Sequence, residues 1–376
     1  MTSDAHVGSW RERWIARRNR WLANPAFHRA ALDFPLTRPI ALARIEGLFD
    51  LVAGFVYAQV LDAVLRLGLL EALRAGPRSL DALAATAGAR TETLAPLLQA
   101  SAALGLTEPL PDGRVALGPQ GAALLGSPGL KDMVLHHRHL YADLADAPAL
   151  FKGEADRGQL AAFWPYAGMN EAGAASAATV APYSALMAAS LPALAEDLLD
   201  AVSLRGRRRL MDVGGGAGVF LSAAARRWPS LSLRLFDLPA VAESAAARLA
   251  SQGLGDRIEC VGGDFLRDPL PEGADVISLV RILHDHDEAG VARLLASARA
   301  ALPPDGLLIV AEPMAGEGRP NRIADAYFAV YLLAMGRGRP RAPTRLEMML
   351  RQAGFSRTRR ARTRAPGLMR VVLAYP

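Results

Sequence analysis

An apolar strand that runs directly into a glycine-rich turn, at residues 210–218, limits the fold of this chain more than any other feature. The turn has the spacing Gly214-x-Gly216-x-Gly218, and a helical pattern follows it over residues 219–228. Glycine has no Cβ, so it can adopt positive φ and let a ligand lie against the N–H groups at the start of the helix. The pattern therefore predicts a strand, a turn and a helix that together hold a cofactor.

The spacing of the glycines indicates which cofactor to expect. A dinucleotide-binding turn has the form G-x-G-x-x-G, but its third glycine would fall here on Val219 or on Leu221, depending on the starting glycine. The prediction of a pyrophosphate ligand is therefore weak. The shorter spacing suits a ligand such as S-adenosylmethionine (SAM), whose methionine part needs close backbone approach and carries no phosphate.

Two further strand ends carry acids that suit a nucleoside. A second strand over residues 232–236 ends on Asp237, about 20 residues past the glycines, where a carboxylate can accept hydrogen bonds from both hydroxyls of a ribose. A third strand over residues 258–261 is followed by Asp264 and Phe265, which suit the amino group and the face of an adenine. Each feature alone also fits an ordinary turn or cap. Together they favour a SAM site.

Strands and helices alternate from residue 194 onward, which predicts a doubly wound, mostly parallel α/β sheet with ligands at the carboxyl ends of its strands. Two further strands are expected near the C-terminus. The predicted strands are residues 209–213, 232–236, 257–261, 275–280 and 306–311, with the final pair around 356–358 and 368–374.

These motifs resemble those of the class I SAM-dependent O-methyltransferases that act on small molecules in plants and bacteria. The matching segments are residues 212–218, Phe236-Asp237-Leu238-Pro239, Gly263-Asp264-Phe265 and Leu283-His284-Asp285. The resemblance covers most of the chain and implies a SAM-dependent enzyme, in which a Rossmann-like domain follows a mostly helical winged-helix dimerisation domain. The cofactor-binding residues that it implies are Asp212, Gly214, Gly216, Gly218, Asp237, Leu238, Asp264 and Phe265.

His284 follows the strand over residues 276–283, at the sheet edge where catalytic groups are expected, and is the candidate general base. Methylation of an alcohol requires loss of its proton, which an imidazole with an ordinary pKa near ~6.5 can accept. The resemblance makes His284 the match to the catalytic histidine of the family and Glu312 the match to the glutamate that orients it. The second orienting glutamate of the family would fall on Arg345, which leaves Glu347 as the nearby substitute.

The acidic run after His284 also fits other roles. Most of the family has tryptophan where His286 stands. Asp287 suits the cap of a helix over residues 288–301, as in an ordinary solvated loop. A metal site built from residues 284–287 is the other alternative, but consecutive residues seldom converge on one ion, so no metal is expected.

The N-terminal arm interleaves Trp10, Trp14 and Trp21 with five arginines, ahead of a segment punctuated by prolines. Tryptophan and arginine on one helix suit a peripheral membrane contact, with indoles at headgroup level and arginines near anionic lipid. The alternative is packing on the protein's own surface or on a partner subunit. The predicted domains are an arm at 1–40, a helical winged-helix dimerisation and substrate-lining domain at 41–193, and a SAM-binding catalytic domain at 194–376.

The segment after the arm has a winged-helix pattern. An apolar helix over residues 48–73 is expected in a core or a subunit interface, and helices capped by Ser79 and Thr91 precede a hairpin with the turn Pro111-Asp112-Gly113. Winged helices often bind DNA, but the second helix has no arginine cluster to meet phosphates, so no nucleic-acid partner is expected. The resemblance implies a homodimer instead.

Three histidines and a set of aromatic and methionine residues lie shortly before the catalytic domain. His136, His137 and His139 point in different directions on a helix, so at most two of them could share an ion, and substrate lining or packing is expected. The other set fits either a core or the lining of a long apolar pocket. Its members are Phe163, Trp164, Tyr166, Met169, Tyr183 and Met187.

Composition bears on location. The formal charge is +6, and Lys131 and Lys152 are the only lysines among 43 basic residues, so the arginine content indicates a compositional bias. Cys260 is the only cysteine, which excludes an internal disulfide and fits the reducing cytoplasm. No run reaches the roughly 18 uncharged apolar residues of a membrane span. We therefore expect a cytoplasmic protein with at most peripheral membrane contact.

A closer likeness concerns the substrate. Four segments are similar to the bacterial enzymes that methylate the tertiary 1-hydroxyl of acyclic carotenoids in spheroidene- or spirilloxanthin-type biosynthesis. They are the arm with residues 34–39, and residues 136–141, 281–287 and 336–341. The resemblance implies a hydroxylated carotenoid as the acceptor and a place on the cytoplasmic face of the photosynthetic membrane. Two alternatives stay open: methylation of another small hydrophobic hydroxylated compound, such as a polyketide, phenol or tetrapyrrole, and a winged-helix regulator that binds SAM without catalysis.

Overall fold

The computed structural model describes residues 9–164 and 177–376. Two compact units make up the chain, Met1–Ala122 and Ala123–Pro376. Of the predicted pocket-lining residues, Tyr166, Met169 and the side chain of Tyr183 lie outside the described residues. The domain boundaries inferred from the sequence, at residues 40 and 193, stay predictions.

The first unit begins with the helices α1 (Trp10–Leu22), α2 (Pro25–Asp33) and α3 (Arg38–Arg66). α1 opens with a capping box: the Ser9 hydroxyl accepts a hydrogen bond from the Glu12 N–H, and the Glu12 carboxylate accepts one from the Ser9 N–H. Asn24 caps α2, which has Pro25 as its first residue. The segment punctuated by prolines is therefore largely helical, because a proline in the first turn of a helix leaves no N–H unsatisfied.

The apolar helix predicted over residues 48–73 has different bounds in the structure. α3 starts earlier, at Arg38, and ends before Gly68, whose φ of 68° separates it from α4 (Leu69–Leu73). A left-handed residue cannot continue an α-helix, so the prediction of one continuous helix was wrong. By length and composition alone, α3 is long and apolar enough to cross a membrane, and 22% of its most apolar stretch is buried. The core helix of a soluble protein passes the same test, so this is weak evidence for a membrane span.

The rest of the first unit has the predicted order of helices and hairpin. α5 (Leu80–Ala87) is capped by Ser79, whose hydroxyl accepts from the Ala82 N–H. α6 (Thr91–Ala103) starts at Thr91 itself, so the prediction of Thr91 as its cap was wrong; the Thr91 hydroxyl instead donates to Asp81 at 3.2 Å. The strands β1 (Thr107–Pro109) and β2 (Val115–Leu117) pair antiparallel across the turn at Gly113, which has a φ of 80°. The helical fold predicted for this part of the chain is confirmed.

Short helices lead from the first unit into the second. His137 separates α8 from α9, so the three histidines do not share one helix as the sequence suggested. The helices are α7 (Pro119–Leu125), which crosses the division between the units, α8 (Pro128–His136), α9 (Arg138–Asp143), α10 (Ala147–Lys152), α11 (Gln159–Phe163), α12 (Ala177–Ser190) and α13 (Pro192–Ala201).

A seven-stranded sheet with the order β5-β4-β3-β6-β7-β9-β8 forms the centre of the second unit. Its first five strands pair parallel, and β9 and β8 add an antiparallel edge, as predicted. The strands are β3 (Arg209–Val213), β4 (Ser232–Asp237), β5 (Ile258–Gly262), β6 (Val276–Val280), β7 (Leu307–Glu312), β8 (Arg357–Ala361) and β9 (Arg370–Tyr375).

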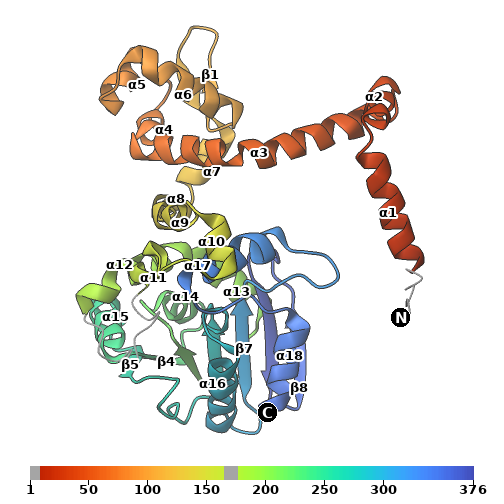
Figure 1. Ribbon diagram of the computed structural model, residues 1–376. Coiled ribbons are helices and arrows are strands. Elements are labelled where there is room, and N and C mark those ends of the chain that lie inside the picture. Colours follow the sequence, from red (N-terminus) through yellow and green to blue (C-terminus); the bar gives the residue numbers. More distant parts are fainter. Residues whose placement is uncertain (1–8, 165–176) are drawn as a thin grey trace. The chain divides into compact units, whose positions relative to one another are not determined.

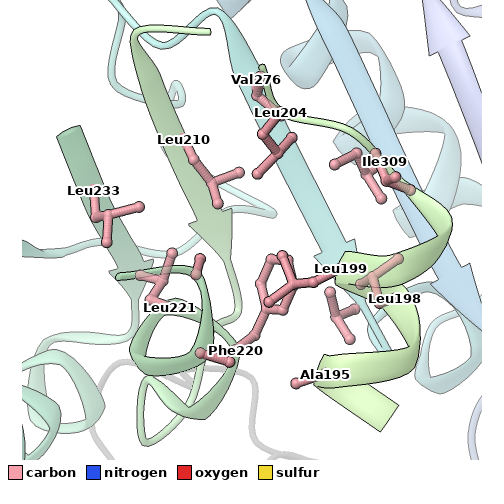
Figure 2. Packing of buried hydrophobic residues seen from close by; sticks show 14 of the residues in the cluster. Ala195, Leu198, Leu199, Leu204, Leu210, Phe220, Leu221, Leu233, Val276 and Ile309 are labelled. Carbon is pink, nitrogen blue, oxygen red and sulfur yellow. The ribbon is translucent and has the colours of Figure 1, made fainter. Parts of the chain in front are cut away.

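Both faces of this sheet are covered by helices and carry separate apolar cores. On one face α13 packs with α14 (Val219–Arg227) and α15 (Pro239–Ser251); Figure 2 shows side chains such as Leu199 and Phe220 directed toward the strands. On the other face lie α16 (Glu288–Ala301) and α18 (Pro343–Gln352). Each fully buried leucine stabilises the fold by about 1.5–3 kcal/mol, which fixes the strand ends in place.

Two irregular helices complete the unit next to the carboxyl ends of the strands. A short 3-10 helix, η2 (Leu283–Asp285), follows β6, and a π-helix, η3 (Arg322–Phe328), leads into α17 (Ala329–Met335). π-Helical turns occur frequently at functional sites. Both elements bring side chains to the same region, described next.

Candidate active site

The glycine turn after β3 has the backbone geometry that the sequence predicts. Gly214, Gly216 and Gly218 have φ values of 70°, 55° and 72°, which L-residues with side chains rarely adopt. A Cβ on Gly214 would lie 2.4 Å from the Ile282 side chain, whereas one on Gly216 would meet nothing within 4 Å. The turn is thus closed on one side by protein and open at Gly216, where a ligand can approach the backbone.

Asp237, the last residue of β4, faces this opening. Its Oδ2 accepts from the Gly216 N–H at 2.8 Å and its Oδ1 from the Leu238 N–H at 2.8 Å. Burial raises the pKa of Asp237 to about 6, although both N–H groups favour the charged form. The carboxylate therefore holds the turn and still lines the cavity beside it.

A cavity of about 390 Å³ lies at the carboxyl ends of β3, β4 and β5. That volume falls within the range of small-molecule sites. Asp264 contributes to the wall and accepts from the Leu266 N–H at 2.9 Å, and Gly218 lies outside it, at the start of α14. The predicted cofactor residues that line the cavity are Gly214, Gly216, Asp237, Leu238, Asp264 and Phe265, joined by Trp164 and Met187 of the predicted aromatic and methionine set.

Asp212 does not line the cavity. It is buried beneath the turn, where its Oδ1 accepts from the Ser278 hydroxyl at 2.6 Å, and a Cβ on Gly215 would meet its Oδ2 at 2.9 Å. Burial raises the pKa of Asp212 to about 7, against the opposing effect of the Ser278 hydrogen bond. The structure therefore places Asp212 against the far side of the turn, where it can support the backbone but cannot touch a ligand in the cavity directly.

His284 and Glu312 lie together at the ends of two adjacent strands. His284 sits in η2 after β6, only 5% exposed, and its Nδ1 is hydrogen-bonded to Oε2 of Glu312, the last residue of β7. The other carboxylate oxygen of Glu312 accepts from the N–H groups of Ile282 and Leu283 at 2.9 and 2.7 Å. Because an acceptor holds Nδ1, the neutral imidazole carries its proton there and leaves Nε2 as the basic atom.

A second carboxylate contacts the imidazole, which the sequence did not predict. Asp285 Oδ1 lies 3.2 Å from His284 Nε2. Burial raises the pKa of Asp285 to about 6. Burial alone would lower the pKa of His284, but Asp285 and Glu312 outweigh it and raise that pKa above its ordinary value. In the sequence, the only indication of this contact is that Asp285 directly follows His284.

Neither Arg345 nor Glu347 reaches the imidazole. Arg345 pairs with Glu288 at 2.5 Å, and Glu347 accepts two hydrogen bonds from Arg360, at 2.7 and 3.0 Å. The structure therefore does not bring Glu347 to His284 in place of the missing glutamate.

The backbone around His284 is instead held from behind by residues 336–341. Arg341, which is buried, donates to the carbonyls of Leu283 and His286 at 2.6 and 2.7 Å, and the Arg339 N–H donates to the His284 carbonyl at 2.8 Å. Gly338 lies so close that a Cβ there would come within 2.1 Å of the His284 oxygen. These contacts explain why Gly338 and Arg341 stand in a segment for which the sequence alone showed only a likeness to relatives.

His286 lines the cavity beside Phe265, with ring centroids 5.4 Å apart and the planes nearly perpendicular. Its Nδ1 is buried and has no hydrogen-bond partner among the described residues. Burial lowers the pKa of His286 to about 3, so the ring is neutral near pH 7. The Asp287 side chain accepts from the Gly290 N–H at 2.7 Å and caps α16, as expected.

A second, smaller space of about 20 Å³ adjoins the cavity at His284. Arg281, Asp285 and Met187 line both spaces, so the two meet at these residues. Arg281 has a φ of 59°, a strained value for a residue with a side chain, and its guanidinium donates to the Ser190 hydroxyl at 2.8 Å. The remaining lining is apolar or aromatic and comes from α8, η3 and α17: Met133, Tyr327, Phe328, Tyr331, Leu332 and Met335.

His136, at the C-terminal end of α8, and His137, which follows it, form hydrogen bonds with the two tyrosines of this lining. His136 Nε2 lies 2.9 Å from the Tyr331 hydroxyl, and His137 Nε2 lies 2.7 Å from the Tyr327 hydroxyl. Burial lowers the pKa of His136 to about 4, so this ring is neutral. Within residues 9–164 and 177–376, no three His, Cys, Asp or Glu side chains are placed to hold a metal ion. Of the two roles expected for these histidines, packing is the one that the contacts support.

Two protein-family models match this chain and cover the residues of the site. The O-methyltransferase domain matches residues 141–356, which include the cavity, His284 and Glu312, and the O-methyltransferase dimerisation domain matches residues 49–127. The chain belongs to the O-methyltransferase family. This O-methyltransferase is 48% identical over 330 residues to demethylspheroidene O-methyltransferase of Cereibacter sphaeroides, a match that covers 88% of the chain and 86% of the relative.

Two further relatives extend the comparison. The demethylspheroidene O-methyltransferase of Rhodobacter capsulatus is 44% identical over 90% of this O-methyltransferase and 84% of its own length. The crystal structure of human N-acetylserotonin methyltransferase in complex with SAM matches with a TM-score of 0.75 and 25% identity, over 88% of this chain and 97% of that one. The predicted fold class is thereby confirmed, and the matched dimerisation domain supports a homodimer.

Proposed function

We propose that this O-methyltransferase transfers the methyl group of SAM to the tertiary hydroxyl of an acyclic hydroxylated carotenoid, with His284 as the general base. The single observation that carries the proposal is the buried His284–Glu312 pair, whose imidazole lines a mostly apolar pocket that adjoins the cofactor cavity. The choice of acceptor is supported by the two relatives at 48% and 44% identity, both demethylspheroidene O-methyltransferases.

The residues of the larger cavity fit SAM. The open side of Gly216 lets the methionine part approach the backbone, and the Asp237 carboxylate has lone pairs left for two ribose hydroxyls. Asp264 and Phe265 suit the amino group and the face of the adenine. When bound, SAM supplies a methyl group on a sulfonium, which leaves readily without electrophilic assistance, so the chain itself need only position both reactants and remove a proton.

His284 performs that removal in the proposed reaction. Its Nε2 accepts the proton of the acceptor hydroxyl as the oxygen forms its bond to the methyl carbon and the electron pair of the breaking bond goes to sulfur. Glu312, which keeps both oxygens hydrogen-bonded, fixes the ring and stabilises the imidazolium that forms. Asp285 occupies Nε2 in the structure, so the hydroxyl must displace this carboxylate to reach the base.

The wall beside His284 suits an apolar acceptor. Its tyrosine hydroxyls are already bonded to His136 and His137, and methionine, leucine and phenylalanine side chains form most of the rest. The space is about 20 Å³, so these flexible side chains must move to admit the end of a substrate. A carotenoid dissolves only in lipid, so we further propose that the reaction takes place on the cytoplasmic face of the photosynthetic membrane.

Product analysis tests the proposal. The purified protein is incubated with methyl-labelled SAM and, in separate reactions, a 1-hydroxylated acyclic carotenoid in detergent micelles or a panel of phenols. We expect label in a methoxy carotenoid and roughly 10²–10⁴-fold less product with His284→Gln, the usual contribution of a general base. Asp256→Asn, a change of an exposed carboxylate away from the cavity, is the control and should leave the amount of product unchanged. Label in a phenol ether alone would support a different acceptor, and no transfer to any acceptor despite SAM binding would support a regulator.

A further inference from the structure

The helix α1 presents two distinct apolar faces. Ile15 and Leu22, seven residues apart, lie on one face and are half-buried, and α1 contacts the following helix α2. Trp10, Trp14 and Trp21 follow a different helical spacing and lie on another face, exposed by 74%, 50% and 43%. The first face is therefore partly covered, while the second is exposed in the described structure.

The exposed face is an ordered stripe of indole rings. Trp14 and Trp21 contact edge to face with ring centroids 6.4 Å apart, and the Arg17 guanidinium lies 4.8 Å from the centroid of Trp21. Such contacts stabilise the rings against one another in water by about 0.5–1.5 kcal/mol, so the stripe is pre-formed. Three large exposed aromatic side chains on one short helix indicate a partner surface and not a chance exposure.

The charge on α1 limits which partner fits. Five arginines and one glutamate give this helix of 13 residues a formal charge of +4, and the glutamate is used in the capping box at Ser9. Arg11, Arg17, Arg18 and Arg20 form no ion pair within the described residues. The indole stripe is therefore flanked by unneutralised positive charge.

We propose that α1 docks this enzyme onto an anionic lipid surface. Indole rings favour the headgroup level of a bilayer, where their apolar body and N–H are both accommodated, and each arginine near anionic headgroups strengthens binding. A helix of 13 residues is only about 20 Å long, too short to span a bilayer, so it lies in the plane of the interface. A second copy of α1 would bring like charges together, which disfavours this face as its own partner.

Flotation of the full-length protein with vesicles tests the proposal without any methyl acceptor or SAM, so its result does not depend on the proposed reaction. We expect co-flotation with vesicles of phosphatidylcholine and phosphatidylglycerol, little with phosphatidylcholine alone, and loss of binding as salt screens the charges. Trp10→Ala/Trp14→Ala/Trp21→Ala and, separately, Arg11→Gln/Arg18→Gln/Arg20→Gln should each lower the partition coefficient at least about tenfold. The second variant keeps the Arg17–Trp21 stack.

Matched variants in the second unit serve as controls. Leu368→Ala removes an apolar side chain that is 47% exposed, and Arg351→Gln/Arg359→Gln/Arg362→Gln removes the same number of exposed charges as the arginine variant. Both should float like the unaltered protein. Circular dichroism and light scattering of each variant exclude unfolding as the cause. Equal binding to neutral vesicles, no binding at all, or dissociation of the tryptophan variant into monomers would each overturn the proposal, the last by identifying the stripe as a subunit contact.

Discussion

Asp237 serves both the turn and the cavity through one carboxylate. It accepts N–H hydrogen bonds from Gly216 and Leu238 and lines the cavity that fits SAM. We expect Asp237→Ala to weaken SAM binding at least tenfold, about 1.4 kcal/mol or more, because charge-assisted hydrogen bonds are lost. Calorimetric titration measures this directly. Glu259→Ala, on the exposed side of β5, is the control, and unchanged affinity in Asp237→Ala would contradict the assignment.

The two carboxylates around His284 predict how the rate depends on pH. The base must be neutral, and its raised pKa keeps it protonated to a higher pH than an ordinary histidine. We therefore expect kcat/KM to rise with pH along a limb whose midpoint lies above 6.5. Asp285→Asn removes one of the negative charges that raise this pKa, so the limb should move to lower pH.

Initial-rate measurements across the pH range give the midpoints, and Asp256→Asn again provides a change of exposed charge without contact to His284. A limb that stays in place in Asp285→Asn would mean that Asp285 does not set the protonation of the base.

The residues of the site were predictable from the sequence to different degrees. Asp237, Asp264 and Phe265 follow strand ends, and strand ends are local features that position residues at one sheet edge. Asp212 also lies near the end of a strand but points away from the cavity. The sequence could not show this, because β3 is buried on both faces and its residues do not alternate between apolar and polar. The position of the Glu347 side chain could not be predicted from the sequence, because its partner Arg360 lies in β8 and comes close to it only in the folded sheet.

At the level of elements, the hydrogen bond between His136 of α8 and Tyr331 of α17 joins α8 to the lining of the site. Tyr331→Phe leaves the buried His136 Nε2 without this partner, which should lower the free energy of unfolding by about 1–3 kcal/mol. Chemical denaturation measures the change. Tyr375→Phe removes a hydroxyl with no hydrogen bond in the described structure and should stay within about 0.5 kcal/mol. Equal stability of both variants would show that the His136 contact contributes nothing.

The five parallel strands were predicted within about one residue at each end, and so were the helices α14 and α16, whereas the bounds of α3 and the break after α8 were not predicted. Each parallel strand is a short apolar run with a turn on either side, which fixes its limits locally. The C-terminal end of α3 depends on Gly68, whose positive φ inside an apolar stretch cannot be inferred from the hydrophobic pattern. The break at His137 has the same character: its ring is held by Tyr327, nearly two hundred residues away in sequence, so tertiary contact decides a local boundary.

For the whole molecule, the exposed side of α3 predicts the quaternary structure. Leu48, Leu51, Val52 and Phe55 repeat at helical spacing and are all more than 60% exposed, and the dimerisation domain begins at residue 49. Burial of this stripe against a second subunit should make the protein a dimer. We expect Leu51→Arg/Phe55→Arg to shift it to monomers in light scattering at micromolar concentration, while Leu368→Arg stays dimeric. A monomeric unaltered protein would contradict the prediction.

The two sides of the reaction centre come from different kinds of element. The glycine turn and Asp237 belong to the ends of strands, whereas Met133, Phe328 and Leu332 belong to helices that close over His284. A substitution on those helices changes the shape offered to an acceptor without displacing a strand. Descendants of such an enzyme can therefore acquire new acceptors one substitution at a time while the supply of methyl groups continues undisturbed.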